Sequence, residues 1–97
     1  MTTIEKRRIV VDGEVVGCIS SFQRFGYAEI SYWIDKRHWG KGIATKALAE
    51  YLLEVKERPI YARAGKDNMG SIRVLEKCGF KRAGTPTTEE LIFVLDQ

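Results

Sequence analysis

The spacing of the apolar residues changes at Gly40–Gly42, and this change constrains the fold more than any other feature of the sequence. Before it, Tyr27–Ile34 alternates between two faces, as a strand does. One predicted face carries Ala28, Ile30, Tyr32 and Ile34, and the other carries Glu29, Ser31 and Trp33. After it, apolar residues recur every three to four positions from Ile43 to Val55, which predicts a helix with one broad apolar face. A strand therefore leads through a glycine loop into a helix.

Two further strands are predicted before this one. Arg8–Val11 is rich in β-branched residues, and Asp12-Gly13 is typical of a two-residue hairpin turn. Val15–Phe22 then returns as a second strand, and Gly26 marks the turn into the third. The first half of the chain is therefore expected to be an antiparallel meander.

After Pro59 ends the helical pattern, Ile60–Ala64 is predicted as a short strand lying between two helices. This position allows parallel pairing with the third strand through a helical crossover. Asp67 or Asn68 can cap the start of a second helix. Gly79 lies at the position just after that helix, which glycine often occupies. The remaining segments are the helix Ser71–Lys77, a strand from Phe80, a loop over Thr85–Thr88 and a strand over Leu91–Leu95. The order β-β-β-α-β-α-β-β predicts one α+β domain over residues 1–97, with a mostly antiparallel sheet.

Composition excludes several classes of function. The 97 residues, 44% hydrophobic and 30% charged, fit a single globular domain. The net charge of +3 is spread along the chain without a clustered basic helix, so we expect no nucleic-acid partner. The longest aliphatic run is only Ile9-Val10-Val11, so we expect no membrane span. Met1–Arg8 lacks the apolar stretch of a signal peptide, and we expect a cytoplasmic protein.

The cysteine and histidine content predicts no metal site. Cys18 and Cys78 lie far apart, and the single histidine, His38, gives no zinc-type spacing. We therefore expect both cysteines to be buried small apolar residues, with neither a disulfide nor a metal.

The glycine loop carries the chemistry. In Arg37-His38-Trp39-Gly40-Lys41-Gly42-Ile43-Ala44, the glycines allow the backbone to approach a ligand closely. The free N–H groups of the following helical turn favour a phosphate or pyrophosphate, and Arg37 and Lys41 add positive charge. A P-loop would need Ser or Thr after its Gly-Lys pair, and a Rossmann loop would need a small residue at Thr45. Glycines that only turn a strand into a helix are the alternative.

Two motifs together resemble a known family. Arg37-x-x-Gly40-x-Gly42-x-Ala44 is similar to the signature of the GCN5-related N-acetyltransferases, the GNAT family. The segment Asn68–Phe80 resembles the Asn-x-x-Ser…Glu-Lys-x-Gly-Phe block of the RimJ/RimL-like branch, which acetylates the N-termini of ribosomal proteins. The strand segment Ala28–Tyr32 also resembles that branch, and the similarity covers about residues 8–95.

The resemblance implies acetyl-coenzyme A (acetyl-CoA) as the acetyl donor and no metal cofactor. The loop of Arg37, Trp39, Gly40, Lys41, Gly42 and Ala44 would hold the pyrophosphate. The third and fourth strands would splay apart, and the pantetheine amides would pair with backbone near Trp33 and Ile34. Asn68 is carried over as a cofactor contact, with a helix cap as the alternative.

The resemblance also suggests catalytic groups. Glu29 would accept the proton that an amine must lose before it attacks, unless it is only a solvated or ion-paired strand residue. Many relatives carry a Tyr in the second helix, where this chain has Leu75, so the role of acid or thiolate stabiliser would pass to Ser71. The alternative for Ser71 is a bond to the helix backbone. Tyr27, Tyr32 and Trp33 are candidates for the acceptor site, although strand aromatics are more often core residues.

The implied function is acetyl transfer to a primary amine, either a protein N-terminus or a small molecule. The alternative is a non-catalytic acyl-CoA-binding or regulatory module. Only about seven residues precede the first predicted strand, so the N-terminal strand and helices usual in the family are expected to be missing. The acceptor site would then be shallow, or would be completed by a second subunit in a homodimer.

Overall fold

The computed structural model describes residues 5–24, 26–84 and 89–96. The strands are β1 (Glu5–Val11), β2 (Glu14–Arg24), β3 (Tyr27–Ile34), β4 (Ile60–Gly65), β5 (Lys81–Ala83) and β6 (Glu90–Leu95). The helices are α1 (Ile43–Glu54) and α2 (Met69–Lys77), with a short 3-10 turn, η1 (Lys36–His38), before α1. The predicted order of strands and helices is confirmed.

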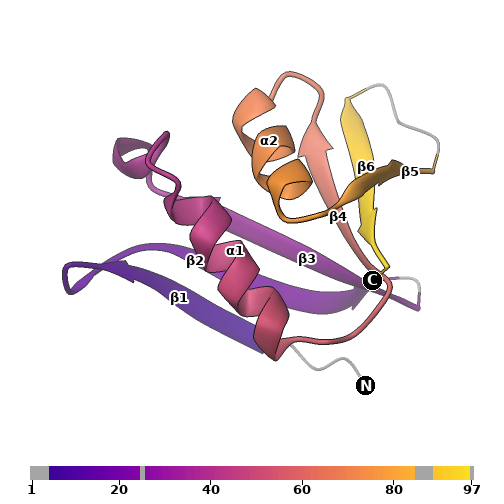
Figure 1. The fold of residues 1–97 in the computed structure, drawn as a ribbon, viewed down its shortest axis with the longest axis horizontal. Coiled ribbons are helices and arrows are strands. Elements are labelled where there is room, and N and C mark those ends of the chain that lie inside the picture. The colour runs from indigo at the N-terminus through magenta and orange to yellow at the C-terminus, as the bar shows by residue number, and fades with distance from the viewer. Residues whose placement is uncertain (1–4, 25, 85–88, 97) are drawn as a thin grey trace.

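The strands form one mixed sheet in the order β1-β2-β3-β4-β6-β5 (Figure 1). Only the β3–β4 pair is parallel, and α1 is the crossover that connects these two strands. Both helices lie over the same face of the sheet. The Tyr51 hydroxyl of α1 donates a hydrogen bond to the Ser21 hydroxyl of β2. Tyr32, which lies on the same face of the sheet as Ser21, shares a hydrogen bond with the Ser71 hydroxyl of α2. The opposite face carries no helix within the described residues.

The core lies between the sheet and the two helices. Its largest fully buried side chains are Phe93, Ile19, Leu48, Ile60, Leu75 and Val16. They come from both halves of the chain, so one apolar core supports the meander with α1 and the C-terminal strands with α2. The predicted apolar face of β3 is part of this core, since Ala28 and Ile30 are buried.

Several boundaries differ from the predicted ones. β1 begins at Glu5 rather than Arg8, because its first residues are charged and give no apolar alternation. α2 begins at Met69 rather than Ser71, directly after its cap. β5 begins at Lys81, because the Phe80 N–H donates to the Leu75 carbonyl and completes the end of α2. Gly79 has a φ of +95° at that end, as predicted. The predicted loop Thr85–Thr88 lies outside the described residues.

The cysteines are less buried than predicted. Cys18 and Cys78 are free thiols, but each is only partly buried. Cys18 lies on the sheet face without helices, whereas the Cys78 thiol donates to the Thr45 carbonyl of α1. Burial raises the pKa of the Cys78 thiol. In the described ranges no helix is long and apolar enough to cross a membrane, and no cluster of potential metal-binding side chains is found there.

Candidate functional site

The central feature of the site is an opening between β3 and β4. The parallel ladder holds only three residue pairs and ends at Ile30 and Ala62. β3 continues to Ile34 alongside β2, while β4 continues to Gly65 alongside β6. The two strands therefore part at their C-terminal ends, and the predicted splay is confirmed.

Every second residue of β3 directs its backbone N–H and C=O groups toward this opening. The Asp35 N–H donates to the Val16 carbonyl at 2.7 Å, so Asp35 faces β2. Because the direction alternates along a strand, Trp33 also faces β2, whereas Tyr32 and Ile34 face the opening. The backbone of Ile34, rather than that of Trp33, is therefore directed toward a ligand between the strands.

The glycine loop is open. Gly40 and Gly42 both have a φ of +76°, a left-handed conformation that favours glycine. A Cβ added at either position would meet no atom within 4 Å. Gly42 precedes α1, and within the described residues no side chain caps the start of this helix. The first N–H groups of α1 therefore keep the partial positive charge that suits an anion.

Side chains of the loop have partners that sequence reasoning missed. The Arg37 guanidinium lies 2.9 Å from the Asp35 carboxylate and 3.7 Å from that of Glu14. Its side-chain hydrogen bond is the main reason that the pKa of Asp35 is lowered. The Trp39 indole N–H donates to the Ile34 carbonyl at 2.8 Å. The Asp35 and Glu14 carboxylates neutralise part of the positive charge that Arg37 brings to the loop.

The start of α2 lies at the other side of the opening. The Asn68 side chain accepts a hydrogen bond from the Ser71 N–H at 3.1 Å, so Asn68 is the N-cap of α2. The Ser71 hydroxyl lies 2.8 Å from the Tyr32 hydroxyl. The cap was predicted from the sequence, which offered Asp67 or Asn68 for it. The contact between Tyr32 and Ser71 follows no sequence pattern. Leu75, one turn further along α2, is fully buried and contributes only to the core.

The cap gives a direct prediction about stability. Asn68→Ala removes the acceptor for the Ser71 N–H, so the free energy of unfolding should fall by about 1 kcal/mol. Asn68→Asp retains an acceptor and should stay within a few tenths of a kcal/mol of the native value. Urea denaturation of the three proteins measures both changes. Equal stability of Asn68→Ala and the native chain would contradict the capping role.

The predicted catalytic residues lie in one pocket. A pocket of about 260 Å3 is lined by Glu29, Tyr32, Ser71, Arg63 and Glu90, among others. Glu29 is 8% exposed, and its carboxylate lies 3.5 Å from the Arg63 guanidinium, which is 3.8 Å from Glu90. The structure therefore brings Glu29 and Ser71 together, and it adds Arg63 and Glu90, which sequence reasoning missed. No local motif marks these two residues, because they come from separate strands.

The two exposed aromatic candidates lie outside this pocket. Tyr27 and Trp33 are 59% and 60% exposed on the sheet face without helices. The Tyr27 ring meets that of Tyr61 edge-on, with 5.5 Å between ring centroids. Neither residue belongs to the core, and neither lines the pocket that holds Glu29 and Ser71.

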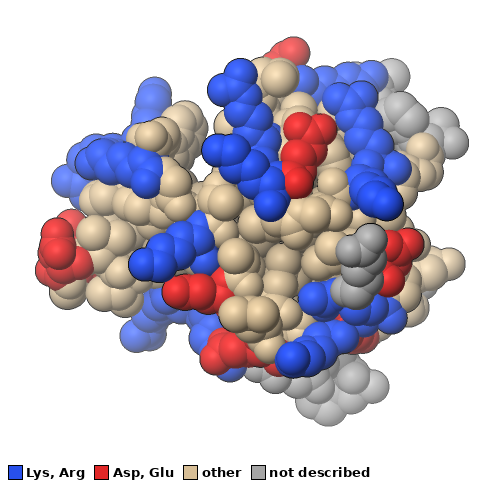
Figure 2. Space-filling view, viewed as in Figure 1, with Lys and Arg blue, Asp and Glu red and all other residues tan. Residues whose placement is uncertain are grey.

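Positive charge gathers around the opening. Figure 2 shows Lys and Arg side chains over η1 and over α2, on both sides of the notch between these elements in this view. Lys36, Lys41, Lys66 and Arg73, which belong to or flank these segments, are all exposed. This distribution suits an anionic ligand lying between the loop and α2.

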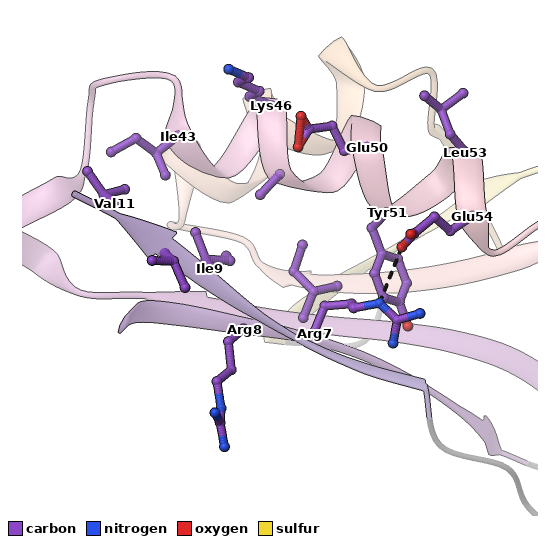
Figure 3. A pocket seen from close by; sticks show the side chains of 13 residues that line it. Arg7, Arg8, Ile9, Val11, Ile43, Lys46, Glu50, Tyr51, Leu53 and Glu54 are labelled. Carbon is purple, nitrogen blue, oxygen red and sulfur yellow. Dashed lines mark hydrogen bonds and ion pairs between the residues drawn. The ribbon is translucent and has the colours of Figure 1, made fainter. Parts of the chain in front are cut away.

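A larger hollow of about 780 Å3 lies elsewhere, between β1 and α1 (Figure 3). Its walls include Ile9 and Ile43, and the Arg7 side chain reaches Glu54 across it at 3.3 Å. It contains none of the predicted site residues. The opening at β3 and β4, rather than this hollow, is therefore the candidate site.

Comparison with known proteins decides the family. A sequence model described as "Acetyltransferase (GNAT) domain" matches residues 4–81. The chain belongs to the GNAT family. A curated relative of this GNAT domain, the probable N-acetyltransferase YjcK of Bacillus subtilis, is 41% identical over 81 residues. The match covers 75% of this chain and 45% of YjcK, so the chain spans less than half the length of that relative.

Solved structures agree with this assignment. The GNAT domain is similar to Mycobacterium smegmatis RimJ in complex with CoA-disulfide, with a TM-score of 0.82 and 27% identity. That match covers 96% of this chain and 53% of RimJ. A GNAT-family acetyltransferase from Bacillus anthracis gives a TM-score of 0.77 and 25% identity, over 88% of this chain and 60% of that protein. The predicted GNAT fold and family are confirmed.

Proposed function

We propose that this chain transfers an acetyl group from acetyl-CoA to a primary amine. The observation that carries the proposal is the pocket at the opening of β3 and β4, where Glu29 and Ser71 lie together. The similarity to RimJ, whose solved structure contains CoA-disulfide, supports the choice of donor. The acceptor class, a protein N-terminus or a small amine, and the cytoplasmic location stay predictions, as does a homodimer.

The residues present fit a CoA thioester. Gly40 and Gly42 leave open space beside the uncapped start of α1, where backbone N–H groups would hold the pyrophosphate. Ile34 would pair its backbone with the pantetheine amides, as an added strand would. When bound, the thioester supplies an activated acetyl group. The other predicted neighbours of the ligand stay predictions: Trp33, Arg37, Trp39, Lys41, Ala44 and Asn68.

Two side chains would then act on the reacting groups. Glu29 accepts a proton from the amine, directly or through water, because only a neutral amine attacks a carbonyl. Ser71 donates a hydrogen bond to the sulfur as the C–S bond breaks and the C–N bond forms. The amine would approach Glu29 from the sheet face that carries no helix within the described residues.

Calorimetric titration with CoA tests the donor site, and two matched glycines sharpen the test. Gly42→Ala places a side chain at a φ of +76° in the loop, and Gly26→Ala does so at +82° in the β2–β3 turn. The two substitutions should cause similar backbone strain, because both place an L-residue in a left-handed conformation. A Cβ added at either glycine would meet no other atom of the protein within 4 Å. We expect Gly42→Ala to raise the Kd for CoA by about tenfold and Gly26→Ala to change it less than twofold.

Release of CoA thiol from acetyl-CoA, with a panel of N-terminal peptides, polyamines and aminoglycosides, tests turnover. CoA binding without turnover on any acceptor would favour the non-catalytic module instead. Absence of CoA binding by the native chain, or equal losses in the two glycine variants, would refute the proposed donor site.

A further inference from the structure

We propose that Tyr32 positions the Ser71 hydroxyl so that this hydroxyl donates to the thiolate of departing CoA. The inference rests on the proposed function and deepens it, because it assigns Tyr32 a part in the reaction that no sequence motif indicates. Tyr32 acts through Ser71 and is therefore a positioning residue.

The distances allow the phenol to donate a hydrogen bond to the Ser71 hydroxyl. The Tyr32 Oη lies 2.8 Å from Ser71 Oγ and 3.4 Å from the Ser71 carbonyl oxygen. Either hydroxyl can donate in the shorter contact. When the phenol donates to Oγ, the hydrogen of Ser71 is released from that contact. It can then point at another acceptor.

The place of the pair in the fold decides what that acceptor would be. Tyr32 lies two residues beyond Ile30, the last β3 residue paired with β4, and Ser71 lies in the first turn of α2. Both line the pocket that also holds Glu29. A thioester between the strands would lie beside this pair, so the developing thiolate is the acceptor within reach.

The surroundings keep the phenol able to donate. Tyr32 is partly buried, and this burial is the main cause of its raised pKa. The Ser71 hydrogen bond acts in the opposite direction and lowers the pKa, and the charge of Cys78 raises it. Tyr32 therefore stays protonated through the neutral range.

Acetyl transfer forms one bond to the acetyl carbon and breaks another. The amine nitrogen forms the new C–N bond and gives its proton to Glu29, directly or through water. The C–S bond breaks with its electron pair on sulfur, and the thiolate is stabilised by the Ser71 hydroxyl, which accepts from Tyr32. Released CoA takes a proton from solvent, and Glu29 returns one to solvent.

Binding of CoA and of desulfo-CoA, which lacks the sulfur atom, tests the proposal without turnover. Calorimetry at about pH 9, where more of the CoA thiol is ionised than at neutral pH, should show the native chain favouring CoA. Tyr32→Phe and Ser71→Ala should each reduce this preference by about tenfold, since each removes part of a hydrogen bond to a charged group. In the double variant, the preference for CoA over desulfo-CoA should fall no further than in the more affected single variant, because the two hydroxyls act as one unit.

Tyr27→Phe is the matched control, because Tyr27 lies on the same strand but outside the pocket. It should leave the preference for CoA unchanged. In acetyl transfer, Tyr32→Phe should lower kcat with little change in KM, and Ser71→Thr should retain more activity than Ser71→Ala.

Three outcomes would overturn the inference. One is an unchanged preference for CoA in Tyr32→Phe. Another is a loss of affinity for CoA and desulfo-CoA by the same factor, which would indicate a purely structural role. If the native chain binds neither ligand, the proposed function fails as well. The first two outcomes leave the proposed function standing.

Discussion

Glu29→Gln should lower kcat for acetyl transfer by about a hundredfold or more at neutral pH. The amide has nearly the same shape as the carboxylate but cannot accept the proton of the amine. Glu29 is 8% exposed within the pocket that also holds Ser71, so solvent does not readily replace it. Steady-state rates of thiol release, measured with the best acceptor of the panel, give the change in kcat directly.

The pH dependence separates this role from a structural one. Above the pKa of the acceptor, about 8 for an α-amino group or 10 for an alkyl amine, the amine is neutral without a base. The defect of Glu29→Gln should therefore shrink as the pH rises through that value. Glu90→Gln is the matched control, since Glu90 also faces Arg63, at 3.8 Å, from β6. A kcat for Glu29→Gln within twofold of the native value would eliminate Glu29 as the base.

Phe93→Ala should lower the free energy of unfolding by about 3–5 kcal/mol. Phe93 is fully buried on β6, and its removal leaves a cavity between the sheet and the helices. Domains of this kind are stable by only about 5–15 kcal/mol, so the variant should lose much of its stability. Chemical denaturation, followed by circular dichroism, measures the loss.

A control for this change lies on the surface. Leu53 on α1 is 71% exposed, so Leu53→Ala should change the free energy of unfolding by no more than about 0.5 kcal/mol. A cost below about 1 kcal/mol for Phe93→Ala would contradict the position of Phe93 in the core.

The elements with strong local signals were predictable from the sequence. β3 has the predicted bounds because Gly26 marks its start and its apolar residues alternate without interruption. α1 ends one residue before the predicted Val55, since a periodic apolar face identifies a helix better than its last residue. The splay of β3 and β4 followed from the family resemblance, and the register of the two strands confirms it.

Contacts between distant segments were not predictable. Tyr32 and Ser71 lie 39 positions apart, and Arg63 and Glu29 lie 34 apart. Each pair depends on how β4 and α2 return to the sheet after the crossover, which no single segment encodes. The pairing of Arg37 with Asp35 was missed for a different reason. The charge pattern suggested a ligand for Arg37, and it gave no sign that the guanidinium would also pair with its own neighbour Asp35.

The short ladder between β3 and β4 has a mechanical consequence. Three residue pairs join the meander to the C-terminal strands, and the reacting groups come from both sides of that seam. Glu29 and Tyr32 belong to the side that carries β3, and Ser71 belongs to the side that carries β4 and α2. A ligand that pairs with both strand edges would add rungs where the sheet has none, and would reinforce the alignment that the Tyr32–Ser71 hydrogen bond already gives across the seam.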